Sequence, residues 1–143
     1  MFTVHVASFS YAASGYPVDE WGHGGGFVFD CRCLPNPGRL EGCGTLTGRD
    51  EPVIRYLRDE SRVEEFLNPI SRVVDIAVAS YKARGFEHLS VAFGCTGGQH
   101  RSVYCAEWLA HRLRRAGETV TITHGSPAMA GVNAVRDMSD HAV

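Results

Sequence analysis

One stretch of the sequence gathers a cysteine, two glycines, a histidine, an arginine and two hydroxyl side chains within eight positions, Cys95–Ser102. An apolar run precedes the stretch and an amphipathic run follows it, which predicts a strand, a loop and a helix. Glycines let a ligand approach the backbone closely, and the N-terminus of a helix attracts anions. We therefore expect an anion-binding site whose members are Cys95, Thr96, Gly97, Gly98, Gln99, His100, Arg101 and Ser102.

The same spacing is also compatible with covalent chemistry. Cys95 and Arg101 are separated by five residues, which is similar to the phosphate loop of the cysteine-dependent phosphatases. In those enzymes a thiolate attacks phosphorus while an arginine holds the phosphoryl oxygens. A carboxylic acid must also protonate the leaving group, and Asp30 or Asp50 could serve. The motif is short, so a binding site without catalysis is the first interpretation and a phosphatase the alternative.

The elements that must position this loop alternate along the chain. Helical spacing of apolar residues fills the region between Asp50 and Arg84, and a second helix is predicted over Arg101–Ala116. Asn68-Pro69 predicts a helix break, and Gly85 a helix end. The strands are predicted at Phe2–Phe9, Phe27–Arg32 (buried on both faces), Leu89–Phe93 and Glu118–Thr123. This alternation predicts an α/β sandwich with a mostly parallel sheet of about four strands.

The length of 143 residues predicts one domain over residues 1–143, with a core over about 2–124 and a weakly ordered tail over 125–143. The formal net charge of −2 argues against a general binder of polyanions. An odd number of cysteines and the absence of an export signal predict a reduced, cytoplasmic protein. No apolar run approaches the ~20 residues that span a membrane.

Other reactive residue types are spread along the chain. A zinc site could be assembled from His23, Cys31, Cys33 and Cys43, but their spacing matches no common zinc module, so we expect no metal and no cofactor. Arg32 could simply pair with Asp30. A basic cluster near the end of the second helix could extend a positive surface or complement the helix dipole; it contains Arg112, Arg114 and Arg115.

Three longer motifs carry a family resemblance: FVFDCRCLPNP at 27–37, LTGRDEPV at 46–53 and GCTGGQHRSVYCAEWLA at 94–110. With Ser8–Tyr11, Gly15 and Pro17 before them, their order and approximate spacing extend from Val4 to His124. The chain resembles the C-terminal domain of the RapZ family of RNase adapter proteins. Several motifs in sequence are more specific than the phosphatase-like spacing alone.

The resemblance implies a fold similar to a subdomain of phosphofructokinase. It also implies that the chain is a free-standing relative of the family domain and that it forms a homo-oligomer. It also implies a pocket for glucosamine-6-phosphate, contact with a small regulatory RNA, and delivery of that RNA to an endoribonuclease. The implied phosphate cradle is Thr96, Gly97, Gly98 and Arg101, with Asp30 and Arg32 facing the sugar or the phosphate. Further implied ligand contacts are Ser8 and Asn36, and implied RNA contacts are Arg112, Arg114, Arg115 and His124.

The sequence departs from the family pattern in three places. No G-x-x-x-x-G-K-[ST] motif occurs, so ATP or GTP binding is not implied. The loop after Ser8 is one residue longer, and Ala13 and Ser14 replace a lysine and a histidine or tyrosine of the family. After His124 the sequence carries one arginine and two aspartates where the family has a basic stretch, which weakens the implied RNA surface.

Overall fold

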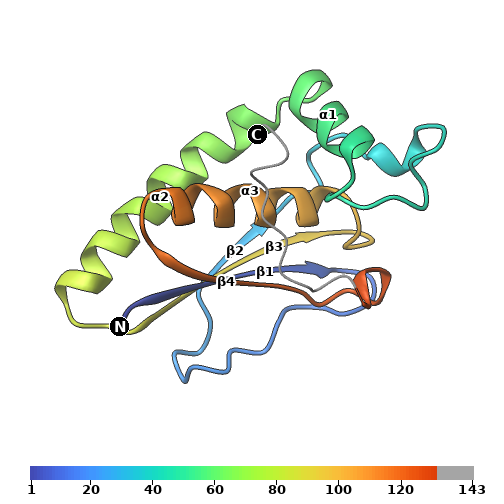
Figure 1. Ribbon diagram of the computed structural model, residues 1–143. Helices are drawn as coiled ribbons and strands as arrows, with labels where there is room; N and C mark the ends of the chain where they lie inside the picture. Colours follow the sequence, from blue (N-terminus) through green and yellow to red (C-terminus); the bar gives the residue numbers. More distant parts are fainter. Residues whose placement is uncertain (132–143) are drawn as a thin grey trace.

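The computed structural model describes residues 1–131, which form a four-stranded sheet with helices against one face (Figure 1). Every neighbouring pair of strands is parallel, and the strand order is β2-β3-β1-β4. The strands are β1 (Thr3–Ser10), β2 (Phe27–Asp30), β3 (His88–Cys95) and β4 (Thr119–His124). The predicted α/β architecture with a four-stranded parallel sheet is confirmed.

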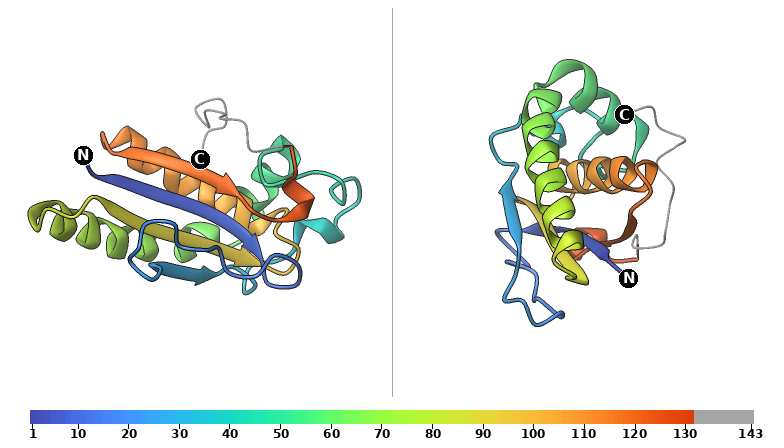
Figure 2. Two further views of the ribbon diagram at one scale, coloured as in Figure 1. Left: turned by 90° about the horizontal axis from the view of Figure 1, so that it is seen from below. Right: turned by 90° about the vertical axis from the view of Figure 1, so that its left-hand side faces the viewer.

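Three α-helices and two short 3₁₀ helices connect the strands. They are η1 (Pro37–Arg39), α1 (Glu51–Glu60), α2 (Val63–Ala83), α3 (Arg101–Arg115) and η2 (Pro127–Met129). α2 ends just before Gly85, which has the left-handed φ of 76° expected at such an end. Figure 2 shows α2 and α3 lying on the same side of the sheet.

The predicted break at Asn68-Pro69 is wrong, because α2 continues through Pro69 without interruption. The helix buries a continuous stripe on both sides of the proline, with Leu67 and Ile70 next to it and Val74 one turn further on. Packing of such a stripe outweighs the hydrogen bond that proline removes, since local propensity is a weak guide where tertiary contacts are extensive.

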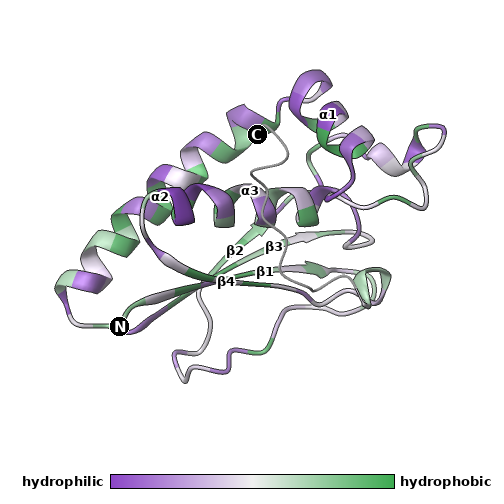
Figure 3. Cartoon of the chain, in the orientation of Figure 1, coloured by the Kyte–Doolittle hydropathy of each residue, from purple (hydrophilic) through white to green (hydrophobic). Residues whose placement is uncertain are grey.

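The hydrophobic core fills the space between the sheet and the helices. Alternate residues of the central strands point into it, as the period of two in a strand requires. Figure 3 shows the apolar colouring along the strands and on the inner sides of the helices. The fully buried members include Val4, Val6, Val91, Phe93, Leu67, Val74, Leu109 and Leu113.

The opposite face of the sheet has no helix. The connection from β1 to β2, residues 11–26, passes over that face as a loop without helix or strand (Figures 1 and 2). β2 is an edge strand with Val28 44% exposed, so the prediction that this strand is buried on both faces is wrong. Among the described helices, none is long and apolar enough to cross a membrane.

Regular structure continues beyond the predicted limit of the core at residue 124. Gly125 N donates to the Ser8 carbonyl at 3.0 Å, and η2 places the fully buried Met129 against the rest of the fold. The remaining part of the predicted tail, residues 132–143, lies outside the described residues.

Candidate functional site

The loop between β3 and α3 lies at the carboxyl edge of the sheet (Figure 1). The chain leaving β1 runs beside it, because Tyr11 N donates to the Cys95 carbonyl at 3.0 Å and Ala12 N to the Thr96 carbonyl at 3.3 Å. From here the chain after β1 leads to β2, while the chain after β3 leads to β4 on the other side. Open parallel sheets bind ligands where successive connections diverge in this way.

Two serine side chains hold this loop in place. Ser10 Oγ donates to the Thr96 carbonyl at 2.6 Å, and Ser126 Oγ donates to the Gly97 carbonyl at 2.9 Å. One serine ends β1 and the other follows β4, so the loop is fixed from two neighbouring strands. No sequence motif predicted a role for either serine.

The two glycines of the loop have different surroundings. Gly98 has a φ of 64°, and a Cβ there would lie 2.6 Å from the Ser126 Cβ, so only glycine fits. Gly97 lacks a positive φ, and a Cβ there would meet no atom within 4 Å. Thr96 and Gly97 are exposed, and they form the part of the loop that a ligand can reach.

His100 and Gln99 join the loop to the segment before α1. His100 Nε2 donates to the Cys43 carbonyl at 2.9 Å, while Gln99 Nε2 donates to the carbonyls of Gly44 at 2.8 Å and Leu46 at 2.7 Å. Burial lowers the pKa of His100, so its ring is neutral near pH 7. Both predicted ligand residues therefore use side-chain donors to position the loop.

The N-terminus of α3 offers backbone N–H groups to a ligand. His100 occupies the N-cap position, but its side chain makes no capping hydrogen bond. The first N–H groups of a helix have no acceptor within the helix, and together they carry a partial positive charge. The exposed Thr96 and Gly97 belong to the loop that leads into this end of the helix, so an anion can approach it from the loop.

Arg101 connects α3 to the turn that follows β2. Its NH1 donates to the carbonyls of Arg32 at 3.2 Å and Leu34 at 3.1 Å. These two bonds use one of its terminal nitrogens, and the residue is buried. Arg101 thereby brings the end of β2, with its two charged side chains, to the same edge of the sheet as the loop.

Asp30 and Arg32 form the pair that the sequence suggested. Arg32 NH2 lies 2.7 Å from Asp30 Oδ2, and Arg32 Nε donates to both carboxylate oxygens at 3.0 Å. The Arg32 guanidinium also lies 3.9 Å from the centre of the Tyr11 ring. Hydrogen bonding from Arg32 lowers the pKa of Asp30, so the pair presents an exposed anion and an exposed cation.

Cys95 is placed less well for attack on a substrate. It is 2% exposed, belongs to the hydrophobic core, and its Sγ donates to the Ser102 Oγ at 3.2 Å. A nucleophilic thiol must reach its substrate as a thiolate, and reactive cysteines are partly exposed. The geometry therefore favours an anion held by backbone groups over a covalent phosphoenzyme.

Two predicted ligand residues have partners inside the fold. Asn36 Oδ1 accepts a hydrogen bond from Gly38 N at 2.9 Å and caps η1. Ser8 is fully buried, and its Oγ lies 2.6 Å from His124 Nδ1. The structure therefore does not bring Ser8 to the surface of the loop.

Ser8 and His124 belong to a buried polar chain that sequence analysis missed. His124 Nε2 lies 3.5 Å from Glu107 Oε2, and Glu107 Oε1 lies 3.1 Å from Arg49 Nε. The order serine, histidine, carboxylate resembles a hydrolytic triad, but Ser8 is 1% exposed and no substrate can reach it there. The chain instead links β1, β4, α3 and the segment before α1 beneath the anion loop. His124, one of the implied RNA contacts, is 3% exposed, so its side chain lies inside the fold in this structure.

The arginines of the predicted basic cluster lie at the far end of α3, about 20 Å from the loop along a helix of 15 residues. Arg112 pairs with Asp75 of α2 at 2.9 Å, and Arg114 NH2 donates to the Val120 carbonyl at 3.2 Å. Arg115 is exposed in the last turn. The structure does not bring this cluster together with the anion loop.

All five cysteines are free thiols, and Cys33 is the exposed one. Within residues 1–131, no group of three or more histidine, cysteine, aspartate or glutamate side chains is arranged to hold a metal ion.

Comparison with known proteins matches residues 2–127 to the family model described as RapZ C-terminal domain. Curated relatives include a nucleotide-binding protein of Fervidobacterium nodosum, 42% identical over 86% of this chain and 42% of its own length. A nucleotide-binding protein of Laribacter hongkongensis is 42% identical over 85% of this chain and 41% of its own length. A nucleotide-binding protein of Bifidobacterium adolescentis is 41% identical over 85% of this chain and 37% of its own length. The chain thus spans about two fifths of the length of these relatives.

Proposed function

The chain belongs to the RapZ C-terminal domain family, and from this premise we propose that it is a regulatory domain that binds a phosphorylated small molecule at the Thr96–Arg101 loop. The observation that carries the proposal is the N-terminus of α3, which lacks a side-chain cap and is preceded by the loop with the exposed Thr96 and Gly97. A phosphate placed there accepts hydrogen bonds from backbone N–H groups and lies in the positive field of the helix.

We propose an amino-sugar phosphate, glucosamine-6-phosphate, as the ligand. Family resemblance supports this choice, and the neighbouring Asp30–Arg32 pair supports it chemically. The Asp30 carboxylate can accept hydrogen bonds from the ammonium and hydroxyl groups of such a sugar, and Arg32 can donate to its oxygens. The curated relatives are named nucleotide-binding proteins, so a nucleotide is the ligand against which the sugar phosphate should be compared.

The proposal is tested by isothermal titration with glucosamine-6-phosphate, with inorganic phosphate, glucosamine and a nucleoside monophosphate as comparators. We expect micromolar binding of the sugar phosphate alone. Gly97→Ala should weaken it by about tenfold or more, because the new methyl group occupies the open space over the loop.

Gly97→Ala is the useful variant because it should leave the fold intact. Arg101→Ala should also abolish ligand binding. Because it removes the two hydrogen bonds that hold the turn after β2, a loss of binding in this variant does not by itself show that Arg101 contacts the ligand. Equal affinity for inorganic phosphate and the sugar phosphate would reject the amino-sugar assignment.

The phosphatase alternative is tested with the same protein. Binding without turnover predicts that Cys95→Ser retains the affinity for glucosamine-6-phosphate, since serine can still donate to Ser102 Oγ. Hydrolysis of a phosphomonoester by the wild-type chain that disappears in Cys95→Ser would establish the enzyme instead.

An adapter role toward a small RNA and an endoribonuclease is the finer part of the same proposal. The support is the family membership together with the arginines near the end of α3, of which Arg115 is exposed. RNA binding through such residues should fall steeply with salt, and Arg115→Ala should reduce the salt dependence as well as the affinity.

A further inference from the structure

A cavity lies away from the anion loop, between the helix-free face of the sheet and the loop that joins β1 to β2. Its volume is about 480 Å³, within the range of small-molecule sites. We propose that this cavity binds a small organic ammonium ion. The proposal is independent of the phosphate site, because it uses other residues and the opposite charge.

The charge of the lining favours a cation. The loop contributes the carboxylates of Asp19 and Glu20, and none of the described residues that line the cavity is a lysine or arginine. The Asp19 carboxylate accepts hydrogen bonds from Trp21 N at 3.2 Å and His23 N at 2.7 Å, so Glu20 is the carboxylate that can turn toward a ligand. His5 lies on the floor, and its pKa is lowered mainly by burial and then by His88, so its ring is neutral near pH 7. The lining therefore carries a net negative formal charge, which favours a cation over a phosphate.

The aromatic residues of the lining favour an organic cation over an inorganic one. Trp21 is 39% exposed and Tyr16 is 65% exposed, and both line the cavity. The Trp21 ring is stacked on His5 at 4.1 Å and on His88 at 4.6 Å between centroids, which holds it in one orientation. The two imidazoles lie 5.2 Å apart and so cover the same face of the indole, which leaves its other face and the Tyr16 ring for a cation. Ammonium groups that bear carbon substituents bind to the faces of such rings.

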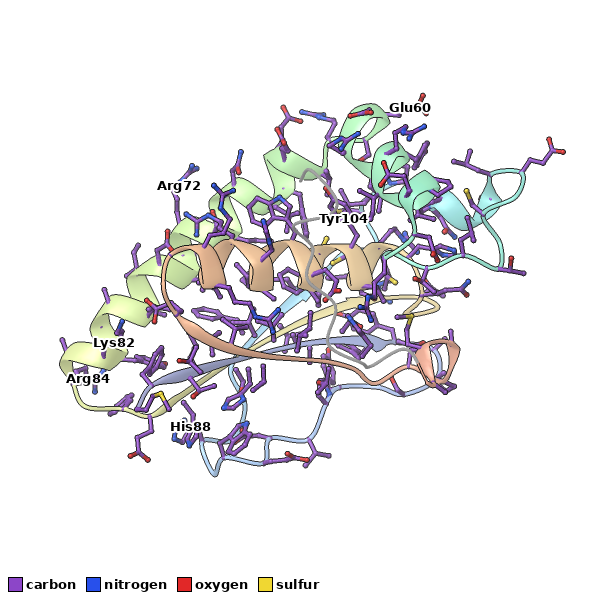
Figure 4. All side chains as sticks on the ribbon, viewed as in Figure 1. Glu60, Arg72, Lys82, Arg84, His88 and Tyr104 are labelled. Carbon is purple, nitrogen blue, oxygen red and sulfur yellow. The ribbon has the colours of Figure 1, made fainter. Side chains whose placement is uncertain are left out.

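The floor of the cavity accommodates alkyl groups. Ala7 and Ala92 lie side by side on β1 and β3, and both line the cavity with small apolar side chains. Gly26 closes the loop against β3 so tightly that a Cβ there would lie 2.1 Å from the Ser90 carbonyl oxygen. Figure 4 shows His88 on this side of the sheet, next to the loop.

The negative charge of the lining, the aromatic faces and the small apolar floor match a cation whose charge is shielded by methyl or methylene groups. Choline is a suitable probe, and its uncharged isostere 3,3-dimethylbutan-1-ol has the same shape without the charge. If the proposal is correct, choline binds the wild-type chain at least about tenfold more tightly than the alcohol, because the carboxylates and rings act on the charge.

The experiment is isothermal titration of both compounds at constant ionic strength. Glu20→Gln and Trp21→Phe should each weaken choline binding about three- to tenfold without weakening the alcohol equally. Glu41→Gln is the control, since Glu41 is an exposed carboxylate outside the lining. Gly97→Ala should also bind choline normally, which separates this site from the phosphate site.

Equal binding of choline and the alcohol would overturn the proposal, because it would show an apolar cleft without charge recognition. Absence of choline binding at millimolar concentration, in protein whose thermal unfolding is normal, would overturn it as well. Loss of choline affinity in Glu41→Gln would locate the cation elsewhere and have the same consequence.

Discussion

Glu107 is the central residue of the buried polar chain beneath the anion loop. It lies between Arg49 at 3.1 Å and His124 at 3.5 Å, and all three side chains are almost completely buried. Removing one member of a buried ion pair leaves an uncompensated charge in a medium of low dielectric constant. The position of the segment before α1 relative to α3 and β4 therefore depends on this carboxylate.

We expect Glu107→Gln to lower the free energy of unfolding by about 3–5 kcal/mol, measured by urea denaturation. The matched control is Asp75→Asn, which breaks the exposed pair with Arg112 and should cost less than about 1 kcal/mol. Similar effects of the two variants would contradict a special role for the buried pair.

His100 gives the stability of the protein a dependence on pH. Its pKa is lowered in the folded chain by burial, with Arg101 also lowering it and Asp50 and the carbonyls of Cys43 and Leu46 raising it less. The unfolded chain therefore binds the proton at a higher pH than the folded chain. The contribution to stability is complete above the ordinary histidine pKa of about 6.5 and is lost as the pH falls through the lowered value.

The measurement is the urea midpoint as the pH is lowered from neutral to mildly acidic. We expect wild-type protein to lose stability over this window and His100→Gln to lose less, since a glutamine amide can donate to the Cys43 carbonyl without titrating. An unchanged pH dependence in His100→Gln would assign the effect to other histidines.

At the residue scale, the sequence predicted the anion loop but not the residues that support it. Thr96 and Gly97 are predictable because a strand, two glycines and a helix occur together. Arg49, Glu107 and His124 are far apart in the sequence, so no spacing relates them. The one available signal is Glu107 itself, a single carboxylate within the apolar stretch of α3.

At the scale of elements, Pro69 is a residue within α2 that lowers the stability of the helix. It lies inside α2, is exposed, and cannot donate the hydrogen bond that a residue there normally makes. We expect Pro69→Ala to raise the free energy of unfolding by about 1–3 kcal/mol, measured by urea denaturation. Arg72→Ala, an exposed change one turn later, should have little effect; Figure 4 shows Arg72 projecting outward from α2.

The strands were predicted to within about two residues because apolar and β-branched residues are concentrated in them. The sequence predicted correctly that β2 is a strand, but it predicted wrongly that both faces of the strand are buried. An apolar strand has the same sequence pattern whether it is central or at the edge of a sheet. β2 lies at the edge because it pairs with β3 alone. The helix break was mispredicted because local rules at Pro69 ignore the apolar stripe that α2 buries.

At the scale of the whole molecule, the structure separates two chemically opposite environments. The carboxyl edge of the sheet carries the anion loop, and the helix-free face carries the acidic, aromatic cavity. The asymmetry follows from the connections between the strands. The connections from β2 to β3 and from β3 to β4 contain helices and lie on one face of the sheet, whereas the connection from β1 to β2 is a loop on the other face.

The strand order also governs how the chain can acquire its structure. β1 is a central strand, yet its partners β3 and β4 come much later in the sequence, with Thr3 opposite His88 and Thr119. During synthesis β1 must therefore remain unpaired until most of the chain has been made. Pairings between such distant segments form slowly, so we expect refolding of the chain to be slow and its yield to fall as the protein concentration rises.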